Sequence, residues 1–196
     1  SGFHEVLVWE PKSGRLLRRL GHQPQRIAAL TWHPQEPWIL IAGGEPGRSG
    51  ELRLVRADSG NLIRAFGTTT DVVLTAAFSP EGNRIAAGGI DNSLSVFQTA
   101  NGRRENRYAV CADWVMDLAW SSDGRRIALA SRDRTARILN AGSGEGTTSF
   151  TTHTGAVNAL SFGADDAKMY SAGRDRTVWR WSSVDAESRS EEHTSE

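Results

Sequence analysis

Three residues in the C-terminal part of the chain, His153, Ser171 and Asp175, are of the types that form a nucleophilic triad. In a triad the histidine removes the proton of the serine hydroxyl, and the carboxylate orients the imidazole. That chemistry also needs a sharp turn that presents the serine and donors that stabilise the oxyanion. Neither feature is visible in the sequence. We therefore expect a structural role for these residues and predict that the protein is not an enzyme.

A glycine-rich stretch, GGEPGRSG at residues 43–50, has the composition of a phosphate-binding loop. No Gly-Lys-Ser/Thr follows it, and no helical pattern begins after it, so the phosphate interpretation lacks its two partners. We expect a long hairpin between two strands instead. A loop that touches a ligand at the mouth of the fold stays open as an alternative.

Metal and thiol chemistry have little support. His22, His33 and His153 are far apart in sequence and have no partner at ligand spacing. The single Cys111 excludes an internal disulfide and a zinc site made of several cysteines. We expect no metal and no cofactor.

Length and charge set the class of protein. The chain has 196 residues, a formal net charge of +0 and 38% hydrophobic residues, enough for one domain with a sizeable core. A neutral balance argues against a dedicated nucleic-acid or membrane-surface binder, which usually has a basic excess. No apolar run is as long as a membrane span, and no signal-peptide pattern begins at Ser1.

A repeat appears in three series of positions. Bulky apolar residues close short strands at intervals of 46, 42, 42 and 42 residues, namely at Trp9, Val55, Phe97, Leu139 and Trp181. A second series follows the same steps through Trp32, Phe78, Trp120 and Phe162. A third, of turn aspartates, runs through Asp91, Asp133 and Asp175. Three markers with one period predict a repeat protein.

Each period contains several short strands and no helix. Residues 72–110 alternate VVLTAAF, RIAAGG, SLSVF and RENRYAV with turns rich in Gly, Asn, Asp and Pro. No window has a convincing amphipathic helical period. Four short antiparallel strands in roughly 40–45 residues make one blade of a β-propeller. The sequence therefore predicts an all-β fold.

Several short motifs point to one family. The pair Gly21-His22 and the stretches FSPEG at 78–82, WSSDG at 120–124 and SAGRD at 171–175 recur in a fixed order. Together they resemble WD40 repeats, which have a GH pair, V-x-F-S-P-D-G, A-S-G-S-x-D and a strand that ends in W-D. The chain departs at the last pair, which is WE, VR, FQ, LN and WS in successive repeats. The resemblance covers residues 5 to about 182.

The resemblance implies a WD40 β-propeller in the form of a partial arc of about four four-stranded antiparallel blades. We expect the last two strands of one blade at 5–20, full blades at 27–66, 72–110 and 114–150, and three strands at 156–181 without an outer strand. Propellers typically have ~4–8 blades, and WD40 rings usually have about seven.

We therefore expect residues 1–182 to be a propeller segment that is truncated at both ends, and residues 183–196 to be a disordered tail. Residues 189–196, RSEEHTSE, match one translation of a common sequencing adapter, so we predict that they are an artefact. An ordinary polar tail is the alternative.

The resemblance also implies a buried hydrogen-bonded network in the last repeat. In this family a loop histidine, a serine or threonine, the turn aspartate and a tryptophan are joined in that way. Only one repeat of this chain has every member, listed here as His153, Ser171, Asp175 and Trp181. A fully satisfied network of this kind stiffens a blade.

The turns Arg132-Asp133-Arg134 and Arg174-Asp175-Arg176 occupy the same place in successive repeats. The resemblance places them on the top face of the propeller, where partners commonly dock. They are either solvated turn residues or bidentate contacts for an acidic peptide or phosphate. The candidate binding residues are Trp114, Met116, Arg132, Arg134, Asn158, Arg174 and Arg176. Trp114 beside arginine fits either a binding hot spot or loop packing.

We expect a non-catalytic protein-interaction scaffold that binds a protein or peptide through its top face, with no nucleic acid. The one acidic residue near an inner strand, Asp117, stands alone, which disfavours a channel active site. The alternative is a regulatory or substrate-presenting propeller of a larger bacterial protein with a cytochrome c-like domain. The haem motif Cys-x-x-Cys-His is missing from this sequence. The cellular compartment stays open.

Overall fold

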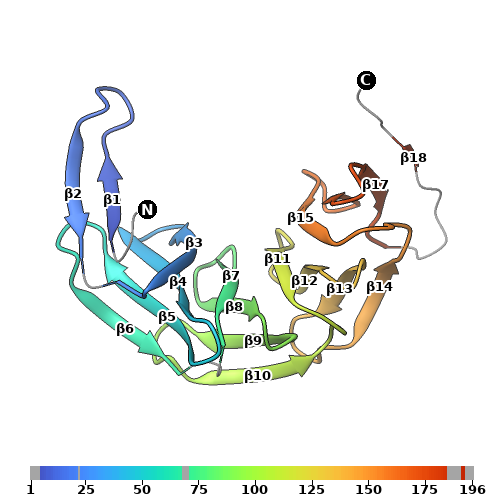
Figure 1. The fold of residues 1–196 in the computed structure, drawn as a ribbon, viewed down its shortest axis with the longest axis horizontal. Helices are drawn as coiled ribbons and strands as arrows, with labels where there is room; N and C mark the ends of the chain where they lie inside the picture. The colour runs from blue at the N-terminus through green and yellow to red at the C-terminus, as the bar shows by residue number, and fades with distance from the viewer. Residues whose placement is uncertain (1–4, 22, 68–70, 185–190, 193–196) are drawn as a thin grey trace.

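The computed structural model describes residues 5–21, 23–67, 71–184 and 191–192, and this part of the chain is entirely β-structure without a helix. Four four-stranded antiparallel sheets and one two-stranded sheet follow one another along an arc that does not close (Figure 1). The prediction of an all-β partial propeller with about four blades is confirmed.

The strands follow the chain in simple order. The N-terminal hairpin comprises β1 (Val6–Trp9) and β2 (Leu16–Leu20). The first blade comprises β3 (Arg26–Trp32), β4 (Trp38–Glu45), β5 (Ser49–Arg56) and β6 (Leu62–Phe66). The second comprises β7 (Val73–Phe78), β8 (Arg84–Gly89), β9 (Ser93–Gln98) and β10 (Arg104–Ala109).

The third blade comprises β11 (Val115–Trp120), β12 (Arg126–Ser131), β13 (Ala136–Asn140) and β14 (Gly146–Phe150). The fourth comprises β15 (Val157–Phe162), β16 (Lys168–Gly173), β17 (Val178–Ser182) and β18 (Glu191–Glu192). In each blade, every strand pairs antiparallel with the next strand of the chain. The glycine-rich stretch 43–50 lies in the β4–β5 hairpin, as we expected, and no helix follows it.

The fourth blade corrects one expectation. We predicted that it lacks its outer strand, but Glu191–Glu192 pair with Arg180 and Trp179 of β17. The sequence EE has neither apolar residues nor alternation, so only backbone pairing makes it a strand. Residues 185–190 and 193–196 lie outside the described residues. The disordered tail and the adapter origin of 189–196 therefore stay predictions.

The hydrophobic core is divided into layers that lie between neighbouring sheets. One layer joins the first and second blades, with Leu40 and Leu54 on one side and Phe78 and Ile85 on the other. Corresponding layers join the second blade to the third and the third to the fourth. A smaller layer joins the N-terminal hairpin to the first blade. The second strands of the first three blades, β4, β8 and β12, are buried along most of their length because they are covered on both faces.

Each inner strand carries a β-bulge near its start. The register with the next strand shifts between Ile27 and Ala29 in β3 and between Val73 and Thr75 in β7. The same shift occurs around Met116 in β11 and around Asn158 in β15. A bulge re-aims a side chain and often lies beside a functional site.

The layered core makes a prediction about two aromatic residues at corresponding positions. Phe78 is 8% exposed in the first layer, whereas Trp32 is 57% exposed. We expect Phe78→Ala to lower the free energy of unfolding by about 3–5 kcal/mol. Trp32→Ala should lower it by about 1 kcal/mol or less. Urea denaturation followed by circular dichroism checks both. Equal losses would contradict a core that lies between the blades.

Candidate functional site

The four residues of the predicted polar network lie together in the fourth blade. His153 Nδ1 lies 2.8 Å from Asp175 Oδ2, and His153 Nε2 lies 2.9 Å from Ser171 Oγ. Trp181 Nε1 donates to the same Ser171 Oγ at 3.2 Å. The side chains of His153, Ser171 and Trp181 are buried. The result is a continuous chain of hydrogen bonds from the turn to the middle of the blade.

Four separate segments hold this network in place. His153 lies before β15, Ser171 is in β16, Asp175 is in the β16–β17 turn and Trp181 is in β17. The ring of Phe150 stacks on Trp181 with a centroid distance of 5.2 Å and an interplanar angle of 11°. The position of these segments in the blade therefore determines which of the side chains hydrogen-bond to each other.

The Asp–His–Ser order resembles a triad, but the serine cannot act as a nucleophile on a substrate. Ser171 is 1% exposed, and its Oγ is engaged by both His153 and Trp181. Burial alone would raise the pKa of Asp175. The hydrogen bonds from Thr177 and His153 outweigh burial and hold that pKa well below the ordinary value. The arrangement is suited to holding a blade together.

The corresponding site of the third blade is apolar. The residues that stand 42 positions, one repeat period, before His153, Ser171 and Trp181 are Cys111, Leu129 and Leu139. All three belong to or contact the core layer between the second and third blades. Burial raises the pKa of the Cys111 thiol, which makes the thiolate scarce. The polar network and this apolar trio are two ways to fill one site without an unpaired polar group.

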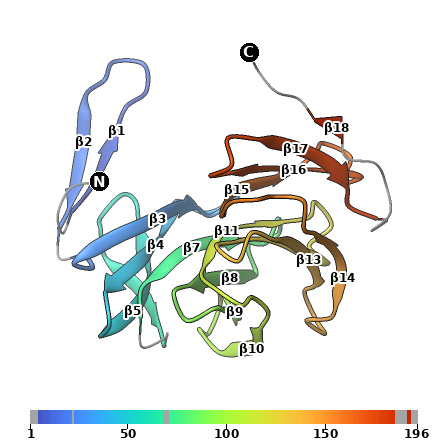
Figure 2. The same ribbon diagram turned by 45° about the vertical axis from the view of Figure 1, so that its right-hand side comes forward.

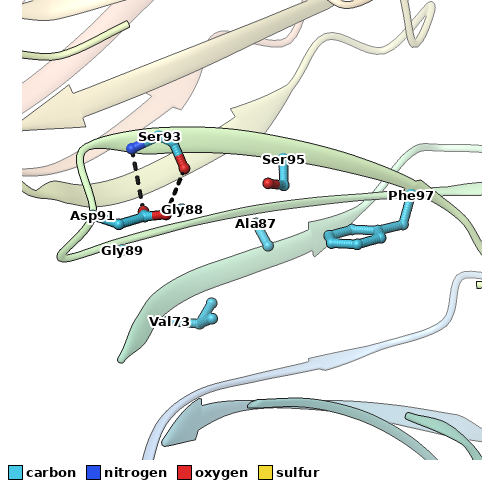
Figure 3. Close-up of a pocket in the computed structure, with 8 residues that line it drawn as sticks. All are labelled: Val73, Ala87, Gly88, Gly89, Asp91, Ser93, Ser95 and Phe97. Atoms are coloured by element: carbon cyan, nitrogen blue, oxygen red, sulfur yellow. Dashed lines mark hydrogen bonds between the residues drawn. The ribbon is translucent and has the colours of Figure 1, made fainter. Parts of the chain in front are cut away.

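In the second blade the same region contains a small pocket (Figure 3). Its lining comprises Val73, Ala87, Gly88, Gly89, Asp91, Ser93, Ser95 and Phe97. Asp91 accepts hydrogen bonds from the N–H and the hydroxyl of Ser93 and from Arg107. Residue 69, at the position that corresponds to His153, lies outside the described residues, so the pocket supports no argument about a ligand.

The two arginine turns are held in the same way in neighbouring blades. In the β12–β13 turn, Arg132 N donates to the carbonyl of Trp114 at 2.9 Å. In the β16–β17 turn, Arg174 N donates to the carbonyl of Ala156 at 2.8 Å. The side chains of Arg132, Arg134, Arg174 and Arg176 are all exposed. Each turn is therefore tied to the segment at the start of the inner strand of its own blade.

Arg132 lies over the ring of Trp114. The guanidinium carbon is 4.4 Å from the ring centroid, and Arg132 Nε is 3.6 Å from Asp113 Oδ2. Trp114 is partly buried, which agrees with loop packing, and its role as a binding hot spot stays a prediction. A cation–π contact of this kind limits the motion of the arginine while its outer edge stays in water.

The aspartates of the two turns make internal bonds. Asp133 accepts hydrogen bonds from Thr135, from the Ala112 N–H and from Arg137. Burial alone would raise the pKa of Asp133, but these donors lower it below its ordinary value. Asp175 is engaged in the same way, with Thr177 and His153. The carboxylates therefore do not neutralise the outer arginines.

Met116 and Asn158, the other predicted contacts, are the residues around which the inner-strand register shifts in the third and fourth blades. Met116 is partly buried and Asn158 is exposed. The sequence showed only that they stand at equivalent repeat positions. It could not show the bulge, because a bulge depends on how two strands align.

Sequence analysis missed the part played by Asp117. Its carboxylate accepts hydrogen bonds from the N–H of Leu118 at 2.9 Å and from the N–H of Leu160 at 3.0 Å. The hydroxyl of Thr75 lies 3.5 Å away. Asp117 therefore links the inner strands β7, β11 and β15. Burial raises its pKa above the ordinary value because the hydrogen bonds only partly offset desolvation.

Among the described residues no group of three or more His, Cys, Asp or Glu is placed to hold a metal ion. His22 lies outside them. His33 instead contacts Phe78, at a centroid distance of 4.8 Å. Within the same residues no helix is long and apolar enough to cross a membrane.

Comparison with known proteins decides the family. The model of the "WD domain, G-beta repeat" matches residues 60–98, and that of the "Anaphase-promoting complex subunit 4 WD40 domain" matches residues 112–165. The chain is a WD40-repeat protein. The first match begins at Gly60, just before β6, and ends with β9, so the sequence repeat is offset by one strand from the blade.

Three relatives illustrate the similarity. A guanine nucleotide-binding protein subunit beta of Oryza sativa subsp. indica is 30% identical over 80 residues, 41% of this chain and 20% of that protein. Centriole proteome protein 16 of Chlamydomonas reinhardtii is 34% identical over 94 residues, which make up 47% of this chain and 4% of that protein. Human transducin-like enhancer protein 6 is 27% identical over 97 residues, which make up 49% of this chain and 16% of that protein.

The chain spans at most a fifth of the length of these relatives. The comparisons do not test the alternative of a propeller in a bacterial redox protein, which stays a hypothesis.

Asp117 makes the WD40 chain sensitive to pH in a defined direction. Because the folded pKa is raised, the folded state binds the proton more tightly than the unfolded state. Its contribution to stability is present below the unfolded pKa of about 3.9 and is lost as pH rises through the folded pKa. We expect Asp117→Asn to be near neutral in stability at pH 4 and relatively more stable than the wild type at pH 7.

Urea titrations of both proteins across this pH range measure the difference. Asp175→Asn is the matched control with the opposite sign, since its depressed pKa stabilises the fold at neutral pH. A difference between Asp117→Asn and wild type that does not change with pH would contradict the burial of the carboxylate.

Proposed function

We propose that this WD40-repeat chain is a non-catalytic scaffold that binds an acidic segment of another protein. The proposed surface, here called the arginine face, comprises Trp114, Met116, Arg132, Arg134, Asn158, Arg174 and Arg176. A protein partner agrees with the relatives, because two matched descriptions name subunits, of a guanine nucleotide-binding protein and of the anaphase-promoting complex. The acidic character of the partner is inferred from the residues of the face.

The observation that carries the proposal is the backbone conformation of two arginines. Arg134 and Arg176 have φ angles of 72° and 66°, in the left-handed region. This region costs an ordinary L-residue roughly 1–2 kcal/mol, while glycine and asparagine adopt it readily. The second blade has Asn92 at the same turn position, with φ 61°. Strained positions of this kind gather at functional sites, so the arginines favour a binding role.

Charge supports the same conclusion. The guanidinium groups of Arg134, Arg174 and Arg176 are exposed and have no ion-pair or hydrogen-bond partner among the described residues. The turn aspartates make internal hydrogen bonds and do not pair with these three arginines. Free guanidinium groups bind carboxylates in a bidentate manner. Arg132 on Trp114 adds the aromatic–arginine pair that is common in binding hot spots.

Charge reversal tests the face directly. The probe is a fluorescein-labelled hexaglutamate peptide, titrated at low and physiological salt and followed by anisotropy. We expect Arg132→Glu with Arg174→Glu to weaken binding by about tenfold or more, because like charges then face each other. The matched control is Arg18→Glu with Arg103→Glu, two exposed arginines outside the arginine face with the same change in net charge. An equal loss in both double variants would refute a specific site.

A second pair of variants separates binding from folding. Arg134→Asn with Arg176→Asn relieves backbone strain, so we expect the free energy of unfolding to rise by up to about 1 kcal/mol per site. Binding of the same peptide should nevertheless weaken. Urea denaturation and anisotropy on the same samples check both effects. Greater stability with unchanged binding would mean that these arginines are only solvated turn residues.

A further inference from the structure

An open groove lies on the outer flank of the arc, between the second and third blades. Its volume is about 400 Å³, and its walls include Val110, Arg137, Leu139, Ser149 and Thr151. Val110 follows β10, and the other four belong to or directly follow β13 and β14. The outer strands β10 and β14 lie away from the inner strands β7 and β11 (Figures 1 and 2). The groove has the size of a small ligand site.

The corresponding space at the other two junctions is filled by aromatic rings. Between the first and second blades, the rings of Phe66 and Phe97 meet at a centroid distance of 5.6 Å. Between the third and fourth blades, Phe150 stacks on Trp181 and also contacts Trp179 at a centroid distance of 5.8 Å. An aromatic pair therefore closes the outer part of both junctions.

The groove lies where this pair is incomplete. Tyr108 and Leu139 stand one repeat period of 42 residues after Phe66 and Phe97. Leu139 has no ring. The hydroxyl of Tyr108 donates to the carbonyl of Gly142 at 2.7 Å, which holds the tyrosine against the β13–β14 turn. The third blade thus lacks the ring that its two neighbours supply.

Arg137 gives the groove a fixed cation. It stands one period before Trp179, so a guanidinium takes the place of an indole. The guanidinium donates to the carbonyl of Val110 and lies 3.2 Å from Asp133 Oδ2, and the side chain is 28% exposed. Because two partners already hold this guanidinium, it loses little freedom when a ring stacks on it. The groove therefore favours an aromatic side chain of a ligand.

Two hydroxyl groups favour tryptophan among the aromatic residues. Ser149 pairs with Arg137 across β13 and β14, and Thr151 directly follows β14. Both residues are exposed, and neither side chain makes a hydrogen bond within the part of the chain that the structure describes. An indole N–H needs an acceptor when its ring is covered, and a hydroxyl oxygen in the wall of the groove supplies one.

The groove is continuous with the arginine face. Asp133, which holds Arg137, lies between Arg132 and Arg134 in the β12–β13 turn. Arg137 follows Arg134 by three residues, which is roughly 10 Å along an extended strand. A segment with acidic residues on Arg132 and Arg134 therefore reaches the groove with an aromatic residue about three positions away.

We propose that this groove binds a tryptophan side chain, contributed by the acidic segment that binds the arginine face. The indole ring packs on Val110 and Leu139 and stacks on the guanidinium of Arg137. Its N–H donates to the hydroxyl of Ser149 or Thr151. This site rests on the proposed function, because the acidic residues of the same segment hold it on the arginine face.

The probe is a peptide of six glutamates, flanked at each end by two glycines and a terminal tryptophan. Tryptophan at both ends makes the direction of the peptide on the arginine face irrelevant. Two reference peptides have alanine or phenylalanine at both ends. Isothermal titration calorimetry with the full chain should give about tenfold tighter binding for the tryptophan peptide than for the alanine peptide, with phenylalanine in between.

Three variants define the site. Leu139→Trp fills the groove with the residue type of the fourth blade and should remove the advantage of the tryptophan peptide over the alanine peptide. Ser149→Ala with Thr151→Ala should make the tryptophan and phenylalanine peptides bind equally well. The matched control is Thr152→Ala with Ser161→Ala, two exposed hydroxyls outside the groove, which should keep the difference. Circular dichroism confirms that each variant is folded.

The outcomes separate the two proposals. An alanine peptide that binds through Arg132 and Arg174, with no gain from tryptophan, overturns the groove site and leaves the proposed function intact. A gain from tryptophan that persists in folded Leu139→Trp also overturns the groove site. If none of the peptides binds, the proposed function and the groove site both fail.

Discussion

The burial of each blade against its neighbours is the constraint on which the whole structure depends. A four-stranded sheet of this size has no core of its own, and the apolar layers lie between sheets. The repeat period follows from this arrangement, because every blade must present the same two faces at the same positions. Polar contacts cross the same junctions. The guanidinium of Arg84 lies over the ring of Trp120, and that of Arg126 lies over the ring of Phe162. The carboxylate of Asp117 accepts a hydrogen bond from the N–H of Leu160.

Because the junctions carry the stability, the turns between strands are free to vary. The site of the polar network has a histidine, a serine and a tryptophan in the fourth blade and an apolar trio in the third, and both are buried. The arginine turns project from these two different interiors in the same way. Turn residues can therefore change without a change of fold.

The repeat was predictable from sequence because its markers are large apolar residues at fixed intervals, and burial between blades requires them. Met116 and Asn158 could be placed by repeat position, but the bulge at each of them depends on strand register. The strand Glu191–Glu192 was missed because it has no apolar pattern. The sequence showed that no other acidic residue lies near Asp117. It did not indicate that the carboxylate accepts a hydrogen bond from the backbone of β15. Arg84 and Arg126 stand 42 residues apart, which is one repeat period, so the sequence does indicate their equivalent positions.

The central claim is that stability lies between blades, and hydrogen exchange measured by mass spectrometry tests it most directly. Strands with a neighbouring blade on both sides should exchange slowest, because their opening needs two layers to separate. The account predicts the strongest protection in β8, β9, β12 and β13 and the weakest in β1 and β2. Protection that is uniform along the arc, or greatest in the N-terminal hairpin, would contradict it.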